Sequence, residues 1–161
     1  MTDKKISDLS ANATLTGAEY TELVQSGGNV KALLSSIKTF INKGESIVLA
    51  ASDETTALTT GAAKVTFRMP YAFTLAAVRA SLTTAQTSGS IFTVDINDGG
   101  TTILSTKLTI DNTEKTSTTA ATPAVISDTA LADDAEITID IDQIGDGTAK
   151  GLKVVLIGTR L

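Results

Sequence analysis

Small groups of apolar residues separated by polar turns occupy the first quarter of the chain, from Lys5 to Ile41. No single group is long enough to fold around itself. Ile6 and Leu9 stand alone in a polar stretch, which predicts an extended arm, and Leu15 begins a turn or a short helical piece. Because such a segment cannot build a core of its own, we expect it to lie on the surface of a partner.

A hairpin and a short helix are the elements that this opening pattern predicts. Two short apolar runs around a Ser-Gly-Gly-Asn turn indicate a β-hairpin over residues 22–33. Ile37, Phe40 and Ile41 then follow at i, i+3 and i+4, which predicts a helix over residues 35–43. Both elements are marginal in water by themselves, so we expect their formation to depend on docking.

The pattern changes just after this helix. Ser35 or Ser36 is suited to cap its N-terminus, and Gly44 is suited to end it. Beyond that glycine the helical spacing does not recur. We therefore predict two parts, a docking arm over residues 1–43 and a β domain over residues 45–161.

Alternation of apolar and polar residues dominates the second part. The three clearest half-buried strands are predicted from Val65, Phe67 and Met69, from Phe92, Val94 and Ile96, and from Ile137, Ile139 and Ile141. Asp98-Gly99 predicts a tight hairpin, and the segment 152–158 is apolar on both faces, which predicts a central strand. About eight strands at regular spacing predict a mainly β fold, an antiparallel jelly-roll-like β-sandwich.

Composition narrows the possible partners. The net charge of −5 disfavours non-specific binding to nucleic acid and to anionic membranes. Aromatic residues make up only 4% of the 161 residues, so we expect an aliphatic core, and the absence of Cys excludes disulfides. The sequence has neither a membrane-spanning apolar run nor a secretory signal, so we expect the chain to be made in the cytoplasm and to remain soluble there at first.

Candidate chemistry is sparse. With no His and no Cys, the sequence lacks the usual catalytic triads, thiol nucleophiles and transition-metal ligands, so we predict no enzyme activity, cofactor or bound metal. Asp140 and Asp142 lie near Glu136 on one predicted strand face, which we interpret as a solvated surface and not a glycosidase pair. Three acidic clusters offer oxygen ligands of the kind that calcium prefers, but none matches a calcium-loop pattern, so we interpret their members as turn residues. The clusters are Asp95 with Asn97 and Asp98, Asp133 with Asp134, and Asp142 with Asp146.

The opening segment resembles a known class of proteins. Lys-Ile-Ser-Asp-Leu at residues 5–9, Leu-Thr-Gly-Ala-Glu at 15–19, Leu-Val-Gln at 23–25 and Leu-Ser-Ser-Ile-Lys-Thr-Phe-Ile at 34–41 are similar to the N-terminal segment of many tailed-bacteriophage virion proteins. Most of these are tail fibres and head or neck appendages. The Thr-rich strands of the second part look like the sandwich domains of phage fibres and capsid decoration proteins.

The resemblance implies a structural protein located in the virion, assembled as a homotrimer with capsid, neck or tail proteins as its partners. The residues that we expect to make the docking contacts are the apolar ones of the arm: Ile6, Leu9, Leu15, Leu23, Val24, Leu33, Leu34, Ile37, Phe40 and Ile41. A capsid cement protein is an open alternative to a fibre or appendage. A module that binds host-surface carbohydrate is a second alternative, although the sequence offers no aromatic platform for a sugar.

Overall fold

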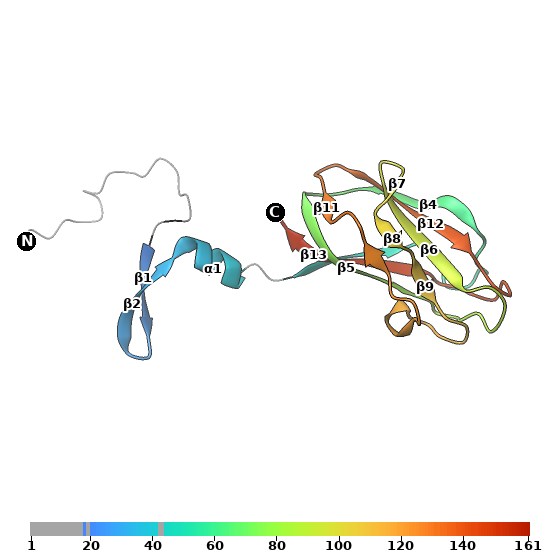
Figure 1. Cartoon of the computed structure of the whole chain (residues 1–161), viewed down its shortest axis with the longest axis horizontal. Helices are drawn as coiled ribbons and strands as arrows, with labels where there is room; N and C mark the ends of the chain where they lie inside the picture. Colours follow the sequence, from blue (N-terminus) through green and yellow to red (C-terminus); the bar gives the residue numbers. More distant parts are fainter. Residues whose placement is uncertain (1–17, 19, 42–43) are drawn as a thin grey trace, which may run out of the picture. The chain divides into compact units, whose positions relative to one another are not determined.

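The chain divides into two compact units in a computed structural model that describes Ala18, residues 20–41 and residues 44–161. The units are Met1–Lys43 and Gly44–Leu161 (Figure 1). The described residues form thirteen β-strands, one α-helix and one short 3-10 helix, so the protein is mainly β. We describe each unit by itself.

The first unit contains a hairpin followed directly by a helix. Strand β1 (Tyr20–Gln25) pairs antiparallel with β2 (Gly28–Leu33), and Gln25 lies opposite Gly28. The two residues between the strands, Ser26 and Gly27, both have positive φ angles of 52° and 79°, as a type I′ turn requires. Relative to the expected hairpin over residues 22–33, β1 begins two residues earlier.

The helix differs in its first turn from the sequence prediction. Helix α1 spans Leu34–Ile41 and begins immediately after β2. Ser35 and Ser36 therefore lie inside the helix and not at its N-cap, so that prediction was wrong. Leu34, which precedes them, is the first residue of the helix, because α1 follows β2 without a connecting loop. Residues 42–43, which the expected helix included, lie outside the described part of the chain.

Two antiparallel sheets make up most of the second unit. The first sheet has the order β11-β5-β13-β3, and its strands are β3 (Glu45–Ala50), β5 (Phe73–Ser81), β11 (Ala130–Leu131) and β13 (Lys153–Arg160). The second sheet has the order β4-β12-β6-β7, and its strands are β4 (Gly61–Arg68), β6 (Phe92–Asp98), β7 (Thr101–Thr102) and β12 (Glu136–Gln143). The long strands of both sheets are visible in Figure 1.

Smaller elements complete this unit. Strand β9 (Leu108–Ile110) pairs with β6 beside β7 in the second sheet. Strands β8 (Leu104–Thr106) and β10 (Val125–Ile126) form a separate two-stranded sheet, and η2 (Ser117–Thr119) is the 3-10 helix. These pieces lie between the long strands in the sequence.

A single aliphatic core lies between the two sheets. Leu75, Val154 and Leu156 from the first sheet and Val94 and Ile139 from the second belong to one buried cluster. The predicted alternation is confirmed for β6 and β12, whose inward residues are completely buried. The central position predicted for the last strand is also confirmed, because β13 pairs with β3 on one side and β5 on the other.

The expected number of strands was too low. Eleven strands lie in the second unit, where about eight were predicted. Three of them, β7, β10 and β11, are only two residues long. Alternation with a period of two residues cannot be recognised over so short a stretch, so the pairings of β10 and β11 leave no pattern in the sequence.

Candidate interaction surfaces

The residues predicted to dock on a partner are distributed over the elements of the first unit. Ile6, Leu9 and Leu15 lie outside the described residues. The others lie on three consecutive elements: Leu23 and Val24 in β1, Leu33 at the end of β2, and Leu34, Ile37, Phe40 and Ile41 in α1. The hairpin register places Leu23 opposite Val30 and Val24 opposite Asn29.

No apolar side chain described in this unit is fully buried. Leu33, Leu34 and Ile37 are half-buried, and the Tyr20 ring is 66% exposed. Every buried hydrophobic side chain that the structure describes lies in the second unit, between Leu58 and Leu156. The described part of the first unit thus presents apolar side chains without enclosing them.

The acidic residues on the outer face of β12 have specific partners. Lys107 Nζ lies 2.5 Å from Asp142 Oδ2 and 2.9 Å from Asp95 Oδ2. The hydrogen bonds that Lys107 donates to Asp142 and, with a smaller effect, to Asp95 raise the pKa of Lys107 well above its usual range. The Asp95 side chain is only 6% exposed, and its other oxygen, Oδ1, accepts hydrogen bonds from Thr102 Oγ1 and the Ile96 N–H. Asp95, Lys107 and Asp142 therefore form one ion-pair cluster.

Asp140, the other carboxylate considered for glycosidase chemistry, has different partners. Its Oδ1 accepts a hydrogen bond from the Ala63 N–H at 2.7 Å, and its Oδ2 accepts one from Asn97 Nδ2 at 3.0 Å. Both oxygens therefore join β12 to the neighbouring strands β4 and β6. These contacts give Asp140 a role in connecting three adjacent strands.

The acidic turns considered for calcium have their own hydrogen bonds. Asp146 accepts from the N–H and hydroxyl groups of Thr87 and Thr148, and these bonds hold the pKa of its carboxyl well below its usual range. Asp134 forms an ion pair with Arg68, which also contacts Glu136. Within residues 20–41 and 44–161, no cluster of three or more acidic side chains is arranged to hold a metal ion.

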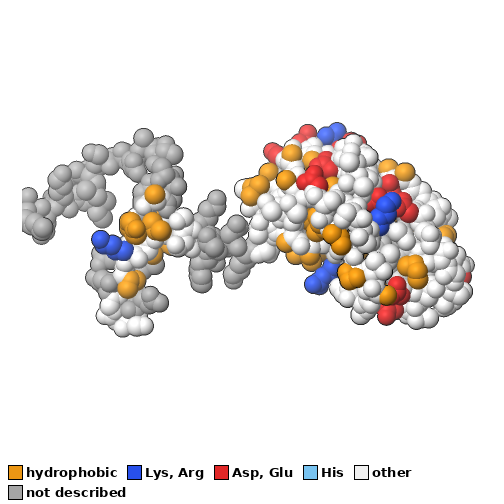
Figure 2. Space-filling view, viewed as in Figure 1, with side chains coloured by type: hydrophobic (Ala, Val, Ile, Leu, Met, Phe, Trp, Pro, Cys, Tyr) orange, Lys and Arg blue, Asp and Glu red, His pale blue; other side chains and the backbone are white. Residues whose placement is uncertain are grey.

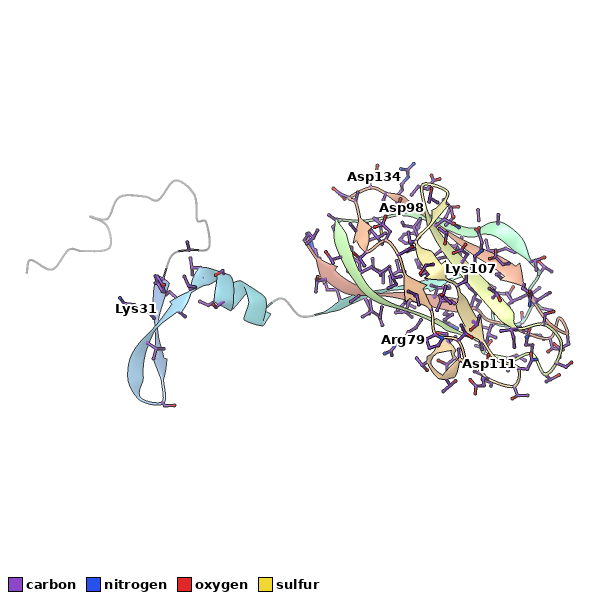
Figure 3. The ribbon with its side chains drawn as sticks, viewed as in Figure 1. Lys31, Arg79, Asp98, Lys107, Asp111 and Asp134 are labelled. Atoms are coloured by element: carbon purple, nitrogen blue, oxygen red, sulfur yellow. The ribbon has the colours of Figure 1, made fainter. Side chains whose placement is uncertain are left out.

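An open groove of about 670 Å³ lies on the second unit. It is lined by β5 residues 76–79, by Pro123 and by β10. Leu108 also lines the groove, and Ser117 and Thr118 of η2 contribute polar groups. Figure 2 shows exposed apolar side chains among charged ones on this side of the unit, and Figure 3 shows Arg79 extending outward beside η2.

The edge of β5 that lines the groove is unpaired between Leu75 and Ala80 in the part of the chain that the structure describes. On this side β11 pairs only with Phe73 and Thr74, and the Leu75 N–H donates to the Thr129 carbonyl. The next bond along this edge joins the Ala80 N–H to Ser117 Oγ. Val78 lies two residues before Ala80, so its N–H and C=O point to the same edge, where the described residues provide no partner. The sequence prediction missed this edge.

Comparison with known proteins finds no matching family model, no matching curated protein and no matching solved structure. None of the helices in the described part of the chain is long and apolar enough to cross a membrane. The function is therefore argued from the residues and their arrangement.

Proposed function

We propose that this chain is a non-enzymatic structural protein of a tailed-bacteriophage particle. Residues 1–43 attach the protein to another virion protein of the capsid, neck or tail, and residues 45–161 are displayed outward. The protein is a homotrimer located in the virion. Attachment uses the apolar residues of the arm, with Ile37 and Phe40 of α1 at the centre of the contact.

The contrast between the two units is the observation that carries this proposal. The second unit encloses an extensive aliphatic core, while the described side chains of the first unit are at most half-buried. A hairpin and an eight-residue helix without a core gain stability when a partner surface covers them. The resemblance of residues 5–41 to phage attachment segments supports the same conclusion from the sequence.

A jelly roll is the finer architecture that we propose for residues 45–161. Its eight principal strands in chain order are β3, β4, β5, β6, β9, β11, β12 and β13. Numbered from one to eight in that order, they form one sheet with the order 1-8-3-6 and another with the order 2-7-4-5. This alternation between two sheets is the strand order of a jelly roll, a frequent domain of viral particles.

The arm can be tested by a double substitution, Ile37→Asp with Phe40→Asp. Charged side chains at these positions oppose burial in an apolar contact. We expect the variant to be lost from purified particles by at least about tenfold, which corresponds to roughly 1.4 kcal/mol of binding free energy. Circular dichroism and thermal unfolding of the β domain should be unchanged.

Ser36→Asp is the matched control for this experiment, because Ser36 is an exposed residue of the same helix. It should enter particles as the unmodified chain does. Normal incorporation of the Ile37/Phe40 double variant would contradict the proposed attachment. Loss of the control to the same extent would show that acidic charge on α1, and not an apolar contact, is what matters.

Copy number distinguishes a fibre or appendage from the alternative role of a cement protein. A fibre or appendage occurs in few copies per particle, whereas a cement protein occurs in hundreds. Quantitative gel densitometry of purified particles against the major capsid protein measures this ratio. Binding of the intact chain to glycan arrays tests the further alternative, a host-surface carbohydrate-binding module.

A further inference from the structure

We infer that the groove beside β5 receives residues 5–9 from a second copy of this chain, added as a β-strand to the open edge. This inference rests on the proposed role of residues 1–43 as a docking arm and adds a function for the start of that arm. The added strand would connect the copies to one another, while the hairpin and helix attach the assembly to the particle.

The first argument comes from the backbone of β5. Between Leu75 and Ala80 the outer edge has no neighbouring strand in the described part of the chain, and Val78 presents its N–H and C=O there. Unpaired strand edges pair readily with extended segments of other chains. Adding a strand to such an edge is a recurrent way in which proteins bind an extended peptide.

The second argument is one of size. The β5 wall of the groove comprises the four residues 76–79. At ~3.3 Å per residue, this stretch is about 13 Å long and matches a strand of four or five residues. A volume of about 670 Å³ provides space for the side chains of such a strand. Lys5–Leu9 has the matching length.

The third argument is chemical complementarity. Arg79 is exposed and lines the groove, and it forms no ion pair with a carboxylate among the described residues. Asp8 would supply that carboxylate. Successive side chains of a strand point to opposite sides, so Leu9 would then point away from Arg79, toward the apolar lining that includes Leu108 and Ile126.

A second copy fits this arrangement because exchange of an identical segment between protomers is a common route to symmetric oligomers. The exchanged strand would bury backbone groups that are otherwise open on β5. In a homotrimer, each copy would donate one strand and accept another. Residues 5–9 lie outside the described part of the chain, so the proposal concerns their sequence and not an observed position.

Disulfide trapping tests this inference directly, because the natural chain has no Cys. The full-length double variant Ser7→Cys with Val125→Cys places one thiol in the arm and one on the groove wall, where Val125 is 50% exposed. Oxidised glutathione serves as the oxidant. We expect covalent dimers and trimers on a non-reducing gel, and their disappearance after reduction.

The matched control is Ser7→Cys with Thr66→Cys, because Thr66 is exposed on β4, which does not line the groove. It should give at least about fivefold less covalent oligomer. An equal yield from both variants would overturn the inference. Cross-links that form only within single chains would also overturn the inference. The arm would then not occupy the groove of a second copy.

Exchange of the two charges provides a second readout. In the Ser7→Cys, Val125→Cys background, Asp8→Arg or Arg79→Asp alone should lower the yield of covalent oligomer about 2–5-fold, as expected for an exposed ion pair. The two changes together should restore the yield, and failure to restore it would contradict the Asp8–Arg79 contact. Particle incorporation is measured separately, so a failed cross-link with normal arm-dependent incorporation would refute only the groove and leave the proposed function intact.

Discussion

The two units of this protein differ in how far their apolar side chains are buried. In the second unit, two sheets enclose side chains such as Phe92 and Ile139, which are completely buried. In the first unit, the described apolar side chains remain partly accessible, and the elements are a two-stranded hairpin and one short helix. The difference distinguishes a domain that encloses a buried core from a segment whose described apolar side chains are not enclosed.

The largest expected effect distinguishes the core of the second unit from the apolar residues of the first. Phe92→Ala removes a buried ring from the middle of the sandwich and should lower the free energy of unfolding by about 3–5 kcal/mol. Ile37→Ala in α1 should change the main unfolding transition by less than about 0.5 kcal/mol, because Ile37 lies in the other unit. Denaturant titration measures both. Similar losses would show that the units unfold as one and would break the comparison.

A smaller effect is expected where backbones approach closely inside the second unit. A Cβ added to Gly158 would lie 2.1 Å from the Thr74 carbonyl oxygen, so Gly158→Ala should destabilise the domain by about 1–3 kcal/mol. Gly61→Ala is the control, because its Cβ would meet only the end of the flexible Lys64 side chain. Thermal unfolding should show a clear decrease for the first variant and little for the second. Equal stability of the two variants would contradict the close packing of β13 against β5.

The ion-pair cluster of Lys107 should contribute less. Lys107→Met leaves the buried Asp95 without its cation and should cost about 1–3 kcal/mol, toward the lower value because Lys107 is 43% exposed. Lys153→Met breaks a pair with the exposed Glu54 and should cost less than about 1 kcal/mol. Denaturant titration of both variants checks the order. The reverse order would show that burial of Asp95 does not decide the strength of the cluster.

The smallest effect concerns a surface loop and depends on pH. Hydrogen bonds from Thr148 and Thr87 lower the pKa of Asp146 in the folded state below its ordinary value of 3.8. A lowered folded-state pKa stabilises the protein above the unfolded-state value, and this stabilisation is lost as the pH falls through the folded-state pKa. The melting temperature of Asp146→Asn should therefore lie below that of the unmodified chain at pH 5–7 and approach it below about pH 4. A difference independent of pH would contradict an ionised Asp146.

The local features of the fold were predictable where the sequence pattern is long enough. Alternation in Phe92–Ile96 and Ile137–Ile141 gave the buried faces, and Asp98-Gly99 indicated a hairpin whose turn residues, Gly99 and Gly100, both have positive φ. These predictions succeed because the residues concerned interact with their near neighbours or face a single core. The two-residue strands β10 and β11 are the counterexample, since their partners β8 and β5 lie far from them in the sequence.

The groove beside β5 could not be predicted for the same reason. Its existence depends on β11 ending its pairing at Phe73 and Thr74, which leaves the rest of that edge open. Asp95 gives a second example. It was interpreted as a turn residue, but it lies in strand β6, where Lys107 and Thr102 bind its carboxylate and leave it almost inaccessible. Sequence patterns identify strand faces, whereas edges and covered polar groups depend on tertiary contacts.

A reconstruction of the intact particle by electron cryomicroscopy tests the central claim most directly. If the first unit is a docking arm, density for residues 20–41 should lie in contact with another virion protein, and the sandwich of residues 45–161 should project from the particle surface. Finding residues 20–41 exposed to solvent on all sides, or the protein absent from purified particles, would contradict this account.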